Sequence, residues 1–347
     1  MSEALPAALA IDGGNSKTDV ALVAQDGTLL ALVRGPGMPG RLGAETVRVI
    51  EELIRSAVRR AGLEHADNDG AGAGPVAAHL VACVANVDLP AEERELERML
   101  REQAWTGTTL VANDTYAVLR AGLDDVPAAG AQQYWGVGVT CGTGINCIGL
   151  APDGSTAGFL ALGMTTGDWG GGGGLGLAAQ WNAVRAADGR GPQTALREAV
   201  PAYFGLKEPL DVAEALHLGE ISWDRIASLA PIVLHVADAG DEVARGLVLR
   251  LAQEIFLLVR SAVSRLELAA EPIPVVLGGG VVASGNALLI DRVTDLITSE
   301  FPAADVRILR QVPVAGAALM GLHLASASLG SKKRLRAAFA SRPAAGA

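Results

Sequence analysis

Apolar and polar positions along the chain predict the same series of strands and helices twice. In the first third, three short apolar or β-branched runs precede a helical pattern, and strands and helices then alternate. Asp26-Gly27 separates the second run from the third, and this dipeptide is a strong hairpin signal. The predicted elements are strands at about 7–12, 18–24 and 28–34, a helix at about 44–61, a strand at about 77–84, a helix opening at Pro90, a strand at about 108–112 and a short helix after Asn113.

The same order begins again near residue 134. A second glycine loop and a second D-G turn, Asp153-Gly154, again separate three apolar runs. A long helical stretch follows before strands and helices alternate once more, and a repeated plan of this kind indicates an internal duplication. The predicted elements are strands at about 134–140, 145–150 and 156–162, helices within about 175–268, a strand at 273–277, a helix at about 285–300, a strand at 305–309 and a helix at about 314–325.

The repeat predicts an α/β protein of two lobes, each built on a βββαβαβα plan. Two such lobes would face each other across a cleft, and loops at strand ends are where open α/β sheets bind ligands. We expect an N-terminal lobe at 1–117 and a C-terminal lobe at 118–325, with a helical insertion at about 180–270. The segment 326–347 is expected to form a C-terminal helix or tail that packs back on the N-terminal lobe.

Composition narrows the classes of function. The formal charge of −10 excludes a general nucleic-acid binder, because no basic stripe is present to neutralise phosphates. The N-terminus lacks a positive segment, and no window reaches the roughly 18 apolar residues of a membrane span, so we expect a cytoplasmic protein without a membrane partner. The three cysteines form no C-x-x-C pair and the five histidines no H-E-x-x-H pattern, which leaves little support for a zinc enzyme.

The glycine loops carry the candidate chemistry. In "DGGNSKT", Gly13 and Gly14 allow close approach of the backbone to a ligand. The amides of Asn15, Ser16, Lys17 and Thr18, with the hydroxyls of Ser16 and Thr18, are suited to donate to phosphate oxygens. Asp12 ends a buried strand, where a carboxylate is costly unless it serves a cation such as Mg²⁺. The alternative is an ordinary tight hairpin in which Asp12 caps amides.

Two further runs and one acid extend the candidate site. "CGTGIN" at 141–146 offers a second cradle, and "LGGGVVASGN" at 277–286 follows a strand and would lay flat backbone against a purine or ribose, unless it is a plain β-to-α connection. No G-x-x-x-x-G-K-[ST] occurs, which excludes a P-loop NTPase. Asp114 follows the strand "TTLVAN" and is either a catalytic base or the N-cap of the next helix.

These loops, together with "PDGS" at 152–155, "GDWG" at 167–170 and "GGGV" at 278–281, resemble the BadF/BadG/BcrA/BcrD family, which includes the N-acetylglucosamine kinases. The similarity spans roughly residues 8–325. It implies two ribonuclease-H-like lobes of the actin-like ATPase fold, use of ATP with Mg²⁺, and a small sugar as substrate. A homodimer, formed through the helical insertion, is a reasonable expectation for this architecture.

The resemblance also implies roles for single residues. It assigns Asp12 to the magnesium side and Asp114 to the catalytic base. Nucleotide binding falls to Gly13, Gly14, Asn15, Ser16, Lys17, Thr18, Gly142, Thr143, Gly144, Gly279, Gly280 and Ser284, and substrate binding to Asp114, Thr143, Asn146, Gly163 and Asp168.

Two departures concern the sugar. Such kinases commonly place a sugar-contacting asparagine after the first hairpin, where this chain has Met38-Pro39, and the usual "GDEG" gains Trp169, which would stack on a sugar face or pack internally. The predicted function is an ATP-dependent amino-sugar kinase. The alternatives are an ATP-hydrolysing activator of the same family, which needs exposed cysteines for an iron–sulfur cluster, and an ATP-binding regulator without catalysis.

Overall fold

The computed structural model describes residues 5–63, 75–126 and 134–341, and the chain divides into two compact α/β units. The first unit comprises Met1–Gly138, Leu150–Ser155 and Leu309–Ala347, and the second comprises Val139–Gly149 and Thr156–Ile308. Each unit therefore draws on separate stretches of the chain. The division into continuous lobes at 1–117 and 118–325 stays a prediction.

The first unit is built on a five-stranded sheet with the order β3-β2-β1-β4-β5. The hairpin strands β1, β2 and β3 pair antiparallel, whereas β4 and β5 are parallel to β1, as expected for strands joined by helical crossovers. At the D-G turn, Gly27 adopts a positive φ of 87°, which explains the glycine. The strands are β1 Ala8–Gly13, β2 Lys17–Val23, β3 Leu29–Pro36, β4 Ala77–Val84 and β5 Thr106–Asn113.

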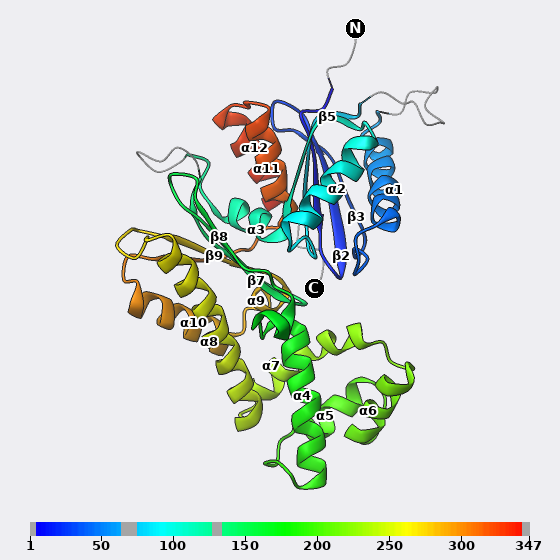
Figure 1. Cartoon of the computed structure of the whole chain (residues 1–347), viewed down its shortest axis with the longest axis vertical. Helices are drawn as coiled ribbons and strands as arrows, with labels where there is room; N and C mark the ends of the chain where they lie inside the picture. The colour runs from blue at the N-terminus through cyan, green and yellow to red at the C-terminus, as the bar shows by residue number, and fades with distance from the viewer. Residues whose placement is uncertain (1–4, 64–74, 127–133, 342–347) are drawn as a thin grey trace. The chain divides into compact units, whose positions relative to one another are not determined.

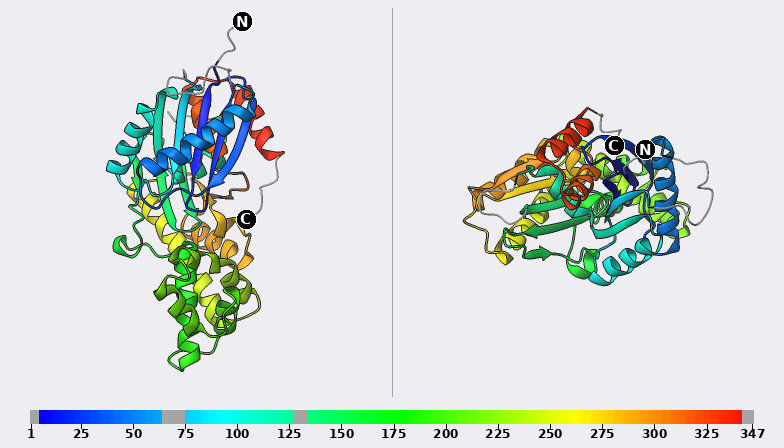
Figure 2. Two further views of the ribbon diagram at one scale, coloured as in Figure 1. Left: turned by 90° about the vertical axis from the view of Figure 1, so that its right-hand side faces the viewer. Right: turned by 90° about the horizontal axis from the view of Figure 1, so that it is seen from above.

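Helices cover both faces of this sheet, because its strands alternate apolar side chains on the two sides (Figure 1). One face packs large residues such as Leu9, Ile11 and Leu80 against α1 and α2, and the other packs small residues such as Ala8 and Ala10 against α3, α11 and α12. Figure 2 shows the same layering from the side. The helices are α1 Ala44–Arg60, α2 Pro90–Glu102, α3 Asp114–Gly122, α11 Val314–Leu324 and α12 Leu329–Ala340.

A second five-stranded sheet has the order β10-β9-β6-β7-β8, which matches the first when corresponding strands are compared. The predicted duplication is therefore confirmed. One strand is shorter than predicted, because β8 ends at Gly158 and the next residues lead into a short 3-10 helix, Gly163–Thr166, with Leu160 and Leu162 exposed. The strands are β6 Gly136–Cys141, β7 Ile145–Leu150, β8 Thr156–Gly158, β9 Pro274–Gly278 and β10 Asp305–Ile308.

The predicted helical stretch lies between β8 and β9, and its helices pack mainly on one another. The long helix α8 contacts α10, α7 and α4, and α4 in turn contacts α5 and α6 (Figure 1). No helix in the described ranges has the length and apolarity needed to span a bilayer. The helices of this stretch are α4 Gly171–Asp188, α5 Leu196–Tyr203, α6 Pro209–Leu218, η2 Trp223–Leu229, α7 Ala230–Asp238 and α8 Glu242–Arg265. Two more helices, α9 Gly280–Ala283 and α10 Ala287–Glu300, follow β9.

Candidate active site

The first glycine loop is a tight turn between β1 and β2, held by backbone hydrogen bonds. The Gly14 amide donates to the Lys17 carbonyl at 2.9 Å, and the Met38 amide donates to the Gly14 carbonyl at 2.9 Å. A Cβ added at Gly13 would lie 2.8 Å from Met38 Cε, and one at Gly37 would lie 2.0 Å from the Asn15 carbonyl oxygen. The glycines are therefore required by close packing, which fixes the direction of the loop amides.

The residues in the middle of this loop are exposed to solvent, and the residue that ends it, Thr18, is buried. Asn15 and Ser16 are exposed and Lys17 is half-buried, so these residues are accessible to a ligand. Thr18 lies in β2 and is fully buried, and its hydroxyl has no partner among the described residues. The structure thus keeps the backbone of the predicted cradle but turns the Thr18 hydroxyl away from the surface.

Asp12 belongs to a row of charged residues that crosses three strands. In the antiparallel register Asp12 lies opposite Asp19, and Asp19 lies opposite Arg34. Arg34 donates to both Asp19 oxygens, from Nε at 2.7 Å and from Nη2 at 2.9 Å. This bidentate pair neutralises the buried Asp19 carboxylate next to Asp12.

The negative charge of Asp12 is disfavoured by its surroundings in this structure. It is 8% exposed, and burial raises its pKa well above 3.8, with the charges of Asp114 and Asp19 adding to the rise. Lys17 and Arg34 lower the pKa, but less. A divalent cation would supply the missing positive charge, and Mg²⁺ usually takes only one or two protein carboxylates together with phosphate oxygens. Asp12 therefore fits the predicted magnesium side, although the described residues contain no ready group of three or more metal ligands.

Asp114 begins α3 at the carboxyl end of β5, and it is half-buried. Burial raises its pKa to about 6, opposed only by a hydrogen bond from the Thr115 amide. The N-cap of α3 is Asn113, whose Oδ1 accepts from the Thr115 amide at 3.0 Å. The capping role that local sequence allowed for Asp114 is therefore filled by its neighbour, and the raised pKa is the property expected of a general base.

The second glycine loop and the 277–286 segment meet in the second unit. The Gly142 amide donates to the Gly144 carbonyl at 2.9 Å, which closes the turn. Gly279 has a φ of 91°, and a Cβ there would lie 2.4 Å from the Cys141 carbonyl. A Cβ on Gly142 would lie 3.7 Å from the Gly280 nitrogen. Two segments predicted to bind nucleotide, more than a hundred residues apart, therefore lie backbone against backbone.

The start of α4 is tied to the same loop. Gly172 and Gly173 donate to the carbonyls of Gly142 and Thr143, at 2.7 and 2.9 Å. Thr143 and Gly144 are exposed at the tip. The Asn146 side chain accepts from the Cys147 amide at 2.7 Å, and the exposed Ser284 donates its hydroxyl to the Val281 carbonyl at 2.6 Å.

Gly163 and Asp168 lie together in the loop that precedes α4. The Asp168 amide donates to the Gly163 carbonyl at 3.0 Å, and Thr166 Oγ1 donates to Asp168 Oδ2. Gly163 has a φ of 72°, the left-handed conformation that glycine adopts readily. The Asp168 carboxylate is thus oriented by its own loop, as a hydroxyl-binding residue would need to be.

Of the two departures at the sugar side, Trp169 is half-buried and packs against neighbouring residues of the protein. The Arg250 guanidinium lies over its ring at 3.9 Å, and a Cβ at Gly174 would lie 3.7 Å from Cδ2 and Cε2 of the indole. Met38 is internal, because it is 5% exposed and joins the core cluster beside Gly13. Met38 is therefore not presented as a replacement contact for sugar, whereas Trp169 keeps part of its surface accessible.

Three residues of the site were missed by sequence reasoning. Arg34 lies within a predicted strand and belongs to no motif. Only the strand register shows that it pairs with Asp19. Asn113 caps α3 and also donates to Asp88 Oδ1 at 2.9 Å. Asn86 follows β4, has a φ of 64° and donates to Asn15 Oδ1 at 2.6 Å. Its signal was an asparagine just after a buried strand, because asparagine tolerates that conformation better than most residues.

Comparison with known proteins identifies the family. A sequence model of the BadF/BadG/BcrA/BcrD ATPase family matches residues 9–321. The chain belongs to this family. The match covers both glycine loops, both acids and the 277–286 segment, so the motif resemblance read from the sequence is confirmed.

Two relatives with similar sequences are named as kinases of amino sugars. An N-acetylmuramic acid/N-acetylglucosamine kinase of Clostridium acetobutylicum is 26% identical over 314 residues, which is 90% of this chain and 97% of the relative. An N-acetyl-D-glucosamine kinase of Dictyostelium discoideum is 25% identical over 319 residues, 91% of this chain and 97% of the relative. A crystal structure described as a proposed N-acetylglucosamine kinase from Chromobacterium violaceum superposes with a TM-score of 0.67 at 26% identity, covering 91% of this chain and 98% of that one.

Proposed function

We propose that the protein is an ATP-dependent amino-sugar kinase of the N-acetylglucosamine or glucosamine type, which transfers the γ-phosphoryl group to a sugar hydroxyl. The observation that carries the proposal is Asp114, a half-buried carboxylate whose pKa is raised to about 6 and whose helix is capped by a neighbouring residue. Membership of an ATPase family and relatives named as kinases of N-acetylated sugars support the same reading.

Asp114 acts as the general base in this proposal. A carboxylate with a pKa near 6 is largely ionised at neutral pH yet is a better proton acceptor than an ordinary aspartate. It accepts the proton of the attacking sugar hydroxyl as the bond to phosphorus forms. Asp168, oriented by Thr166, binds other hydroxyls of the sugar and fixes its position.

The glycine loops bind phosphate and nucleoside. Amides and side chains at Asn15 to Lys17 donate to phosphate oxygens, and Thr143 with Gly144 adds a second set of donors. The segment at Gly279, whose backbone packs closely against that of Cys141, binds the adenosine in this proposal. Asp12 would hold Mg²⁺, which supplies charge neutralisation to the phosphates when bound.

The family's activator branch is not favoured by any residue of the site. All three cysteines of the chain are buried, and burial raises the pKa of the Cys141 thiol to about 12 and those of Cys83 and Cys147 as well. Buried thiols with raised pKa are poor cluster ligands, since the thiolate is the binding form.

The test is an ADP-release assay of the purified protein with glucosamine, N-acetylglucosamine, N-acetylmuramic acid and glucose. We expect ADP release that depends on an amino sugar and on Mg²⁺, and its loss in Asp114→Asn. Asp291→Asn is the matched control, because Asp291 is exposed on α10. If no sugar in the panel stimulates ADP release, the kinase proposal fails.

A further inference from the structure

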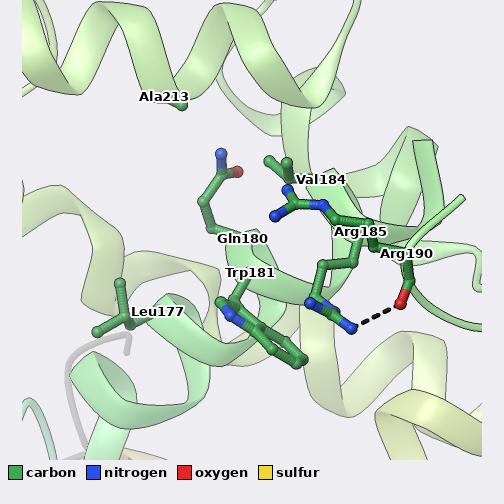
Figure 3. Close-up of a pocket in the computed structure, with 7 residues that line it drawn as sticks. All are labelled: Leu177, Gln180, Trp181, Val184, Arg185, Arg190 and Ala213. Atoms are coloured by element: carbon green, nitrogen blue, oxygen red, sulfur yellow. Dashed lines mark hydrogen bonds between the residues drawn. The ribbon is translucent and has the colours of Figure 1, made fainter. Parts of the chain in front are cut away.

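A separate pocket lies on the helical part of the second unit, between α4 and α6. Its volume is about 260 Å³. Figure 3 shows the side chains of α4 and of the turn that follows it surrounding this space, with Ala213 of α6 on the opposite side. The lining residues are Leu177, Gln180, Trp181, Val184, Arg185, Arg190 and Ala213. None of them was predicted to bind ATP or sugar.

Gln180 gives the pocket a hydrogen-bond acceptor, Oε1, to which no protein group donates among the described residues. Its side chain is only 6% exposed, and Nε2 donates to the Pro209 carbonyl at 2.8 Å, which fixes the amide orientation. The Oε1 atom is buried and accepts no hydrogen bond within the described part of the chain. A buried carbonyl oxygen without a partner costs free energy, so a ligand that donates to it would be favoured.

Arginines give the pocket a positive charge. Arg190 reaches toward Gln180 in Figure 3 and is paired with Asp188 at 2.6 Å. Arg185 lies 4.4 Å from the Trp181 ring centroid and donates to the Arg190 carbonyl at 2.6 Å. Two guanidinium groups and one carboxylate leave a net positive charge, which favours an anion.

The remaining wall is apolar and open to a ligand. The Trp181 side chain is 56% exposed and Leu177 is 52% exposed, although both line the pocket. Exposed indole next to a guanidinium is a common surface for a flat ring, because the ring removes apolar area from water and stacks on the aromatic face.

We propose that this pocket binds a small aromatic carboxylate that also carries a hydroxyl or N–H donor. The carboxylate pairs with Arg190 and Arg185, the ring lies against Trp181 and Leu177, and the donor reaches Gln180 Oε1. The volume of about 260 Å³ admits a molecule of roughly ten heavy atoms, just below the roughly 300–1,000 Å³ typical of sites for drug-sized ligands. The site is independent of the proposed kinase activity, because it shares no residue with it.

The probe that tests the proposal is 4-hydroxybenzoate, measured by calorimetry on the full chain. Benzoate lacks the donor, and 4-hydroxybenzamide lacks the charge. We expect 4-hydroxybenzoate to bind at one site per chain, and each analogue to bind about ten-fold more weakly, a difference of ~1.4 kcal/mol. Changing the probe tests the Gln180 acceptor without altering a buried residue.

Variants then locate the site. We expect Arg190→Ala and Trp181→Ala to weaken binding of 4-hydroxybenzoate about ten-fold, since both side chains are largely exposed and their removal leaves the fold intact. Arg197→Ala and Trp223→Ala are the matched controls, an arginine paired with a neighbouring acid and an exposed tryptophan on the same helical part, and neither should change binding.

Three outcomes overturn the proposal. The first is no saturable binding of 4-hydroxybenzoate at concentrations up to about 10 mM, which corresponds to a free energy too small for a built site. The second is binding that Arg190→Ala and Trp181→Ala leave unchanged. The third is a Trp181→Ala variant that sediments as a smaller species than the wild type, because the pocket would then be covered by a second copy of the chain.

Discussion

Replacing Asp114 by asparagine should make the protein less active and more stable at the same time. Asparagine keeps the size of the side chain but removes both the proton acceptor and the buried charge. Loss of a general base typically costs 10²–10⁴-fold in rate. The stability gain follows from the same burial that raises the pKa of Asp114 to about 6.

The size of the gain depends on pH with a defined sign. Below the ordinary pKa of 3.8 the carboxyl is protonated in the folded and unfolded chain, so its burial costs nothing through ionisation. Above about 6 it is ionised in both, and the folded state is disfavoured by the difference, up to ~3 kcal/mol at pH 7. Because partial ionisation applies between these values, we expect the gain to fall to about half of that at pH 5.

Urea unfolding at pH 5, 6 and 7 measures the free energy of unfolding of wild type and Asp114→Asn, and ADP release measures activity on the same samples. Wild-type kcat/KM for the sugar should fall below about pH 6, when the base of the free enzyme becomes protonated. Asp291→Asn should change neither quantity. An Asp114→Asn protein that is destabilised, or that keeps wild-type kcat, would refute the assignment of Asp114 as a buried base.

Three further substitutions test other parts of the site. Arg34→Ala leaves Asp19 buried without its bidentate partner and should lower the free energy of unfolding by about 2–3 kcal/mol in urea, with Arg34→Lys recovering only part of it. Gly279→Ala forces a Cβ to within 2.4 Å of the Cys141 carbonyl at a positive φ, so the KM for ATP should rise at least several-fold in steady-state assays; an unchanged KM would separate this loop from the nucleotide. Met38→Asn should lower the thermal midpoint, at a cost of about 2–4 kcal/mol, without improving the KM for sugar, because the side chain is buried beside Gly13; an improved KM would show that residue 38 faces the substrate.

Most of the fold could be predicted because short sequence signals specify the elements of both copies of the duplicated plan. The two D-G turns, the two glycine loops and the helical periodicity at 44–61 each specify an element by short-range chemistry. The end of β8 could not be predicted, since Leu160 and Leu162 look like strand residues but are exposed in the structure. A run of apolar residues indicates a strand only where another element of the fold packs over their side chains.

The site was predictable where backbone shape carries the function and less so where side chains pair across strands. Glycines in the sequence indicate positions of close packing, and Gly279 is required by its contact with the Cys141 backbone at a positive φ. The pairing of Asp19 with Arg34 depends on register, which a hydrophobic pattern fixes only after the strands are aligned. The sequence allows two roles for Trp169, and only the structure shows that it packs against Arg250 and Gly174 with part of its surface still accessible.

The two copies of the duplicated plan carry different chemical groups at equivalent positions. The central strand of the first sheet has Asp12 as its next-to-last residue, and the first unit also contains Asp114, so the acids proposed for magnesium and for the general base lie in the same unit. The equivalent strand of the second sheet ends in Cys141, whose surroundings are backbone atoms of the second glycine loop and of Gly279. Because these two acids act on proton and phosphate chemistry while the glycine backbone around Cys141 shapes a binding surface, substitutions of Asp12 and Asp114 should act mainly on kcat. Substitutions at Gly142 and Gly279 should act mainly on the KM for ATP.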